Sequence, residues 1–124
     1  MLQLRSILKV ADNTGAKKAS MIGMSKKGNR RFAYLGEVIN ISVKEAIPYA
    51  QVKKGEVLTA VIIRTKKEKK RSDGSYIRFD DNACAILLAK DSKEPKGTRI
   101  FGPIAKEVKD AGFGKIASLA EEMY

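Results

Sequence analysis

The residues that could do chemistry in this sequence are cations gathered in short runs. One run is Lys66, Lys67, Lys69, Lys70 and Arg71, and another is Lys26, Lys27, Arg30 and Arg31. Such runs suit phosphate groups, because each cation can neutralise one phosphate and release its counterion. Phe32 and Tyr34 follow the second run directly, and aromatic rings beside cations suit RNA, whose exposed bases stack on them. The pattern therefore indicates a phosphate-rich partner.

The overall charge supports the same interpretation. Lys and Arg number 25 against 14 acidic residues, which gives a net charge of +11 and a pI near 9.8. The natural partner is a polyanion, and nucleic acid is favoured over a membrane surface because the basic runs lie in turns rather than on an amphipathic helix. Four further cations complete the predicted phosphate-contacting set, namely Lys53, Lys54, Arg64 and Arg78.

The sequence offers little for catalysis. It contains no histidine and a single cysteine, Cys84, so the commonest general base and zinc ligand is missing. Asp80 and Asp81 are adjacent and would point to opposite sides of an extended chain, which suits a turn better than a shared acid-base site. Cys84 lies in an apolar run and is predicted to be buried and inert. We expect no catalytic residue, no metal site and no cofactor.

The strongest strand signal lies just before the first basic run. Val57 to Thr65 is rich in β-branched residues and apolar on both alternating faces, which predicts a central strand covered on both sides. After the basic run, Ser72 to Ser75 is a turn signal that returns the chain into Tyr76 to Phe79. This stretch is predicted to form a long hairpin with a basic tip.

Shorter elements fill the rest of the chain. Strands are predicted at Leu4–Val10, Lys18–Met24, Val38–Val43 and Ala83–Leu88. A helix is predicted to begin at Pro103 and stop at Gly112, and one more helical turn is held by Ile116 and Leu119. A mainly β fold follows, and a small barrel is the economical arrangement because closure removes exposed strand edges. We expect one domain over residues 1–124, with the barrel over about 1–88 and a loop and short helices over about 89–124.

A longer motif crosses the hairpin. Ala60 and three aliphatic residues are followed after nine positions by Asp73-Gly74, after four more by Phe79, and after two more by Asn82. Further characteristic segments are Val10–Lys17, Ser42–Pro48, Val52–Val57 and Glu94–Pro103. In these features the chain resembles large-subunit ribosomal protein fourteen, in its bacterial or organellar form, along nearly its whole length.

The resemblance implies a fold, a function and partners. The expected fold is a five-stranded barrel with a small helical C-terminal part. The expected function is structural, through binding of large-subunit rRNA at the face that meets the small subunit, with a contact to small-subunit rRNA at a bridge. Expected protein partners are large-subunit proteins three and nineteen and a ribosome silencing factor. No signal peptide or membrane span is expected, so the location would be the ribosome of the cytoplasm, or of the matrix or stroma in an organelle.

A protein-docking patch is expected in the C-terminal third, at Thr98, Arg99, Lys115 and Ser118. The preceding loop carries mixed charge, which attracts phosphate less than the basic runs do, and the resemblance places the silencing-factor contact in this region. An exposed arginine beside small polar residues can anchor a protein through charge-assisted hydrogen bonds. The alternative is that Arg99 simply pairs with Glu94 or Glu107.

The chain departs from the family pattern at two places. Ala85 occupies a position that usually holds valine, and the ending from Gly114 to Glu122 lacks the usual methionine and proline.

Two other functions stand as alternatives to this interpretation. A free single-stranded nucleic-acid-binding barrel is one rival, but only four Phe, four Tyr and no Trp are available as stacking platforms. An enzyme is the other, and no nucleophile beside a base and no Gly-rich phosphate loop supports it.

Overall fold

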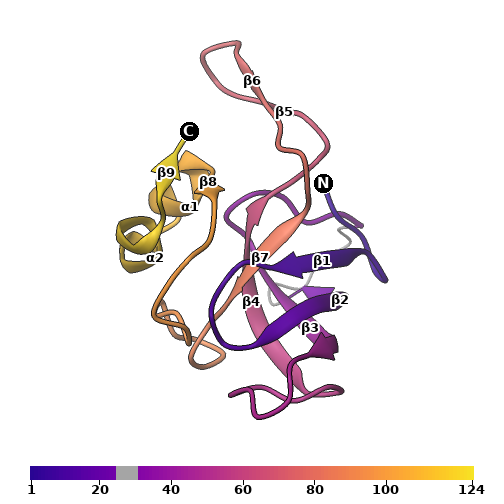
Figure 1. The fold of residues 1–124 in the computed structure, drawn as a ribbon. Coiled ribbons are helices and arrows are strands. Elements are labelled where there is room, and N and C mark those ends of the chain that lie inside the picture. Colours follow the sequence, from indigo (N-terminus) through magenta and orange to yellow (C-terminus); the bar gives the residue numbers. More distant parts are fainter. Residues whose placement is uncertain (25–30) are drawn as a thin grey trace.

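A closed barrel forms the body of the protein (Figure 1), seen in a computed structural model that describes residues 1–24 and 31–124. Around the barrel, the strands are β1 (Ile7–Val10), β2 (Ala16–Met24), β3 (Val38–Ala46), β4 (Val57–Arg64) and β7 (Ala83–Ile86). Neighbouring strands pair antiparallel, except that β1 and β7 pair in parallel and close the barrel. The mainly β fold expected from the sequence is confirmed.

Smaller elements project from the barrel or cover one side of it. The strands β5 (Lys69–Lys70) and β6 (Tyr76–Ile77) form a hairpin, and β8 (Pro103–Ile104) pairs in parallel with β9 (Glu122–Met123). Two short helices, α1 (Lys106–Asp110) and α2 (Gly114–Leu119), lie between β8 and β9. We call residues 66–78 the arm and residues 100–124 the tail. Within the described residues, no helix is long and apolar enough to cross a membrane.

The strands β4, from Ala60 onward, and β7 are covered on both faces, and for β4 its β-branched run predicted this. On their inner face, Ala60, Ile62 and Cys84 belong to the core that fills the barrel. On their outer face, Val61 and Ile63 belong to a second core beneath the tail. Because side chains alternate along a strand, one pair of strands can serve as the wall between two cores.

The second core fastens the tail to the barrel. Phe113 and Ile116 are among its fully buried side chains, and they pack in one cluster with residues of β4 and β7. Ala85, which stands where the family pattern has valine, has no exposed surface in this cluster. A small residue at this point lets the tail pack close to β7.

The predicted helix start at Pro103 is wrong. Pro103 and Ile104 form β8, and α1 begins only at Lys106, after an Ala105 with extended backbone angles. The amide of Ala105 donates to the carbonyl of Ile63 on β4, and the carbonyl of Ile104 accepts from the amide of Tyr124. These long-range hydrogen bonds hold the segment extended, although proline is favourable at the first position of a helix.

Two further boundaries differ from the sequence prediction. The first strand begins at Ile7 rather than at Leu4, because Arg5 has a φ of 70° and the chain turns there. In the segment after β7, predicted to be an exposed loop, Pro95 is buried and forms a bridge with Leu87. The remaining barrel strands agree with their predictions apart from a few terminal residues.

Asp12 ties the β1–β2 turn to β7. Its carboxylate accepts hydrogen bonds from the amide of Thr14 at 3.2 Å, the Thr14 hydroxyl at 2.6 Å and the amide of Ile86 at 3.0 Å. Burial raises the pKa of the Asp12 carboxyl, and these hydrogen bonds oppose the shift. The carboxylate therefore serves the fold by satisfying donors in the β1–β2 turn and on β7.

Cys84 is predicted to react slowly with thiol reagents. The residue has no exposed surface, and burial, with a smaller effect of the nearby Asp12, raises the pKa of its thiol. Because the thiolate is the reactive form, labelling must wait until the barrel opens. We expect labelling about a hundredfold or more slower than at an exposed cysteine.

The matched control is Ser72→Cys in a Cys84→Ala background, which places the thiol on the exposed turn of the arm. Time-resolved labelling under native conditions compares the two proteins. Equal rates at the two positions would contradict the burial of Cys84.

Candidate nucleic-acid interface

The arm carries the first basic run away from the barrel (Figure 1). Its turn is formed by Gly74, which has a φ of 90°, and by Asp73, whose carboxylate accepts from the amide and hydroxyl of Ser75. Lys66, Lys67 and Lys70 are exposed and Lys69 is half-buried. The arm therefore presents several cations to solvent on a short hairpin.

One ion pair occurs within the arm itself. The Lys67 ammonium lies 3.2 Å from the Glu68 carboxylate, and both side chains are largely exposed. Exposed pairs of this kind contribute little to stability and are screened by salt. Lys67 can therefore exchange Glu68 for a phosphate at little cost.

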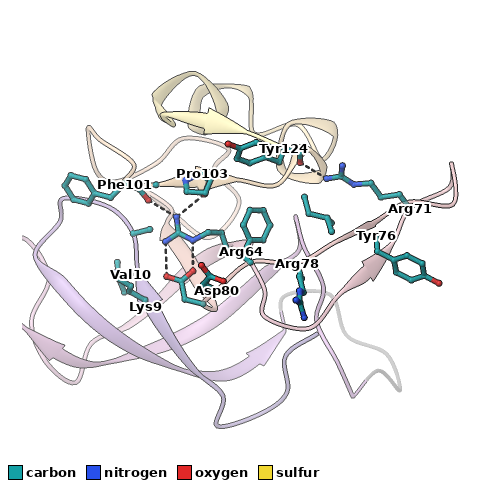
Figure 2. Close-up of a pocket in the computed structure, with 15 residues that line it drawn as sticks. Lys9, Val10, Arg64, Arg71, Tyr76, Arg78, Asp80, Phe101, Pro103 and Tyr124 are labelled. Atoms are coloured by element: carbon teal, nitrogen blue, oxygen red, sulfur yellow. Dashed lines mark hydrogen bonds and ion pairs between the residues drawn. The ribbon is translucent and has the colours of Figure 1, made fainter.

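Arg71 has a different role, because it fastens the arm to the tail (Figure 2). Its guanidinium lies 2.9 Å from Glu107 on α1 and donates to the main-chain oxygen of Tyr124 at 2.6 Å. The other carboxylate oxygen of Glu107 is buried and has no partner among the described residues. Arg71 therefore sets the direction of the arm, and only part of its guanidinium is available to an outside partner.

Arg64 is buried and internally bonded, which argues against its predicted role as an RNA contact. Its side chain is 6% exposed and donates to Asp81 at 2.9 Å and to the carbonyls of Phe101 and Pro103 at 2.9 and 3.0 Å (Figure 2). A planar guanidinium suits this set of acceptors, because it offers five donors in fixed directions. These partners occupy most of the guanidinium donors, although the side chain lies at the wall of the cleft described below.

Gly102 makes the Arg64 site possible. It has a φ of +80°, and a Cβ atom added there would lie 2.4 Å from an Arg64 nitrogen. A side chain at this position would therefore displace the guanidinium. The sequence signal for the site is the pair of residues Asp81 and Gly102, which become neighbours of Arg64 only in the folded chain.

A cleft of about 1100 Å³ separates the arm from the tail and the barrel (Figure 2). Arg78 and Lys9 line it as exposed cations, together with the exposed ring of Tyr76 and the half-buried ring of Phe79. Lys9 was not predicted, because it alternates with buried residues on β1 and belongs to no basic run. Cations and rings in one cleft are suited to phosphates and unpaired bases.

The second basic run can be placed only in part. Lys26, Lys27 and Arg30 lie outside the described residues, and Arg31 is exposed. Three residues later, Tyr34 lines a small hollow of about 360 Å³ together with Lys67 and Lys69 at the base of the arm. The structure therefore brings the segment that follows this run next to the first basic run.

Lys53 and Lys54 lie away from the arm. Both are exposed and precede β4, whereas the arm follows it, so the length of β4 separates the two groups (Figure 1). A strand of this length spans roughly 25 Å. The predicted phosphate contacts therefore occupy both ends of the barrel.

The predicted docking residues do not form one hydrogen-bonded unit. The side chain of Asn13 donates to the Thr98 hydroxyl at 2.8 Å and accepts from the amides of Thr98 and Arg99. The Ser118 hydroxyl donates to the Lys115 carbonyl within α2. This role of Asn13 could not be predicted from local sequence, since Thr98 lies 85 positions away.

Arg99 itself is exposed and has no ion pair within the part of the chain that the structure describes. Glu107, one proposed partner, binds Arg71 instead. The alternative interpretation, in which Arg99 is neutralised by Glu94 or Glu107, is not supported. The guanidinium is therefore available to an outside partner.

Fold and charge together define a small basic β-barrel protein with cation-bearing loops at both ends. Residues 1–124 match the family of ribosomal protein L14p/L23e, and the chain belongs to this family. Its members are structural constituents of the large ribosomal subunit and are typically not enzymes. The resemblance seen in the sequence is confirmed, and membership implies a location in the ribosome.

Replacing Arg64 is predicted to destabilise the protein more than replacing any exposed arm lysine. Arg64→Ala leaves Asp81 and two partly buried carbonyls without their donor, and such losses cost about 2 to 4 kcal/mol of unfolding free energy. Arg64→Lys should rescue little, because an ammonium cannot reach all of these acceptors. Denaturant unfolding measures the effect, and the matched control is Lys66→Ala, which should change it by about 0.5 kcal/mol or less. Equal effects of the two alanine variants would contradict the structural role of Arg64.

Proposed function

We propose that this protein binds large-subunit rRNA through its basic loops and lies at the face of the large subunit that meets the small subunit. The observation that carries the proposal is the arm, which presents exposed cations on a hairpin held in a fixed direction by Arg71 and Glu107. The proposed contacts in the arm and the cleft are Lys66, Lys67, Lys69, Lys70, Arg71 and Arg78. The proposed contacts elsewhere are Lys26, Lys27, Arg30, Arg31, Lys53 and Lys54.

A fixed arm favours folded RNA over flexible single strands. Cations on a rigid hairpin meet phosphates whose spacing is already set by the RNA fold, so little conformational entropy is lost on binding. The cleft behind the arm adds aromatic surface and one further cation, Lys9, on the barrel side. In this proposal the protein recognises the shape and charge of rRNA through its own rigidity.

The neighbours proposed in the ribosome are those that the family resemblance implies. They are large-subunit proteins three and nineteen, small-subunit rRNA at an intersubunit bridge, and a ribosome silencing factor. The exposed guanidinium of Arg99, next to a Thr98 that Asn13 holds in place, is the proposed anchor for the silencing factor. Lys115 and Ser118 on α2 are proposed as part of the same surface.

Changing Lys66, Lys67, Lys69 and Lys70 to Ser is predicted to weaken rRNA binding and its dependence on salt. Arg71 is kept because it holds the arm to the tail. Removing up to four phosphate contacts should make the slope of log affinity against log salt shallower by up to roughly 3. Filter binding of a folded large-subunit rRNA fragment over a range of salt concentrations measures the slope.

The matched control makes the same change to Ser at four exposed lysines of the region after β7, namely Lys90, Lys106, Lys109 and Lys115. It changes the net charge by the same amount and should leave the slope almost unaltered. An unaltered slope in the arm variant, or equal losses in both variants, would overturn the proposed role of the arm.

Arg99→Ala together with Thr98→Ala is predicted to separate protein docking from RNA binding. Both side chains are exposed, and the change removes one hydrogen bond to Asn13 within the protein. Incorporation into large subunits should stay intact, while binding of the silencing factor falls by about thirtyfold, as expected for the loss of an anchor residue. Sedimentation of subunits and a pull-down with the factor measure the two effects. Loss of incorporation would show that the patch contacts RNA instead.

A further inference from the structure

Tyr49 is an unusual residue in this structure. Its relative exposure is 106%, so the ring covers essentially no part of its own protein. Its φ is 63°, and among the described non-glycine residues only Arg5 shares a positive φ. Bulky side chains rarely adopt this backbone conformation, and when they do the surrounding structure must enforce it.

The turn that contains Tyr49 is held firmly on both sides. The amide of Ile47 donates to the carbonyl of Gly15 at 2.9 Å, and the amide of Gln51 donates to the carbonyl of Thr14 at 3.1 Å. Between them, Ala50 packs so tightly on Gly15 that a Cβ atom at position 15 would lie 2.3 Å from the Ala50 Cβ. The strained backbone of Tyr49 is therefore a consequence of anchoring the turn, and it directs the ring outward.

Lysines flank the Tyr49 turn in the sequence on both sides. Lys44 precedes the turn and Lys53 and Lys54 follow it, and all are exposed. The hydrogen bonds from the Val43 amide to the Glu56 carbonyl and from the Gly55 amide to the Val43 carbonyl bring the two flanks together. No ion pair involves these lysines among the residues described, whereas the nearby Glu45 is paired with Lys18.

An exposed ring on a rigid turn, flanked by unpaired cations, matches an unpaired nucleotide of RNA. The base can stack on the ring while the adjoining phosphates meet the lysines. A protein partner would use the ring differently, by burying it in an apolar pocket. The three exposed lysines on the flanks of the turn, which have no ion pair among the described residues, favour a polyanion instead.

We propose that Tyr49 is a stacking platform for an unpaired base of rRNA. The inference rests on the proposed function, and it adds a recognition mode that the arm lacks. The Tyr49 turn precedes β4 and the arm follows it, so the two would hold RNA at opposite ends of the barrel (Figure 1). The arm contributes phosphate contacts, and the Tyr49 turn contributes a contact with a base.

Tyr49→Trp provides a direct test, because the chain contains no tryptophan and the new indole is the sole reporter. Stacking on a base quenches indole fluorescence, so titration with a folded large-subunit rRNA fragment should quench the signal. The matched control is Leu88→Trp, which places the indole at a residue that is 56% exposed next to the mixed-charge loop. Its emission should stay almost constant. An unquenched indole at position 49 in a complex that has formed would overturn the inference.

Affinity gives a second and independent test. Tyr49→Phe should bind RNA like the parent protein, whereas Tyr49→Gly should bind about tenfold or more weakly, with an unchanged salt slope because no phosphate contact is lost. Tyr49→Gly should be at least as resistant to heat as the parent, since glycine adopts a positive φ without strain. Affinity and stability would thus move in opposite directions, which a folding defect cannot produce.

Parent-level RNA affinity of Tyr49→Gly would overturn the stacking role, and so would a loss confined to binding of another ribosomal protein. The failure of the proposed function would look different. In that case the parent protein and the variant with four arm lysines replaced would bind the fragment equally weakly. The Tyr49→Gly change would then leave this weak affinity for the fragment unaltered.

Discussion

The structure depends on two strands that are buried on both faces. The alternating side chains of β4 and β7 fill the barrel on one side and support the tail on the other, so two cores share one wall. Each core alone would be small for a chain of this length, and joining them through a common wall lets the helices of the tail contribute to the same cooperative unit. Disturbing this wall would loosen the barrel and the tail together.

The end of β4 is where the fold becomes a binding surface. Arg64 closes the wall by bonding to the turn after the arm and to the start of the tail, and Arg71 then fixes the arm against α1. Both arginines donate hydrogen bonds inside the protein, Arg64 with most of its donors and Arg71 with part of them. The lysines between them have at most an exposed pair with Glu68, and their charge is directed to solvent and to an external polyanion.

This division between internally bonded arginines and exposed lysines explains how one basic sequence supports both folding and binding. Guanidinium groups, with several donors in fixed directions, suit the internal network, while flexible ammonium groups suit phosphates whose positions vary. Whether a given cation has the internal or the external role depends on its burial, which its neighbours in sequence do not indicate. Arg64 and Lys66 are two positions apart, yet one is buried and the other fully available.

Local patterns predicted much of this molecule. The β-branched run of β4, the turn at Asp73 and Gly74 and the burial of Cys84 follow from side-chain types and spacing, and all are present. The basic loops were also predicted as exposed turns, and Lys53 and Lys54 agree.

The sequence could not reveal features that arise from contacts between distant positions. Pro103 became a strand because β4 and β9 supply hydrogen bonds to its neighbours. Arg64 was expected at the surface, and its acceptors at Asp81, Phe101 and Pro103 become apparent only after folding. The strain at Tyr49 depends in the same way on Gly15, more than thirty positions earlier.

The most direct measurement compares the affinity of the complete chain for a folded large-subunit rRNA fragment with its affinity for an unstructured oligonucleotide of equal length. Both are measured at the same salt concentration, because the number of phosphates sets the nonspecific part of the affinity. A rigid arm and a fixed turn predict at least about a tenfold preference for the folded RNA. Equal affinity for the two RNAs would contradict shape recognition and would indicate a general single-strand binder instead.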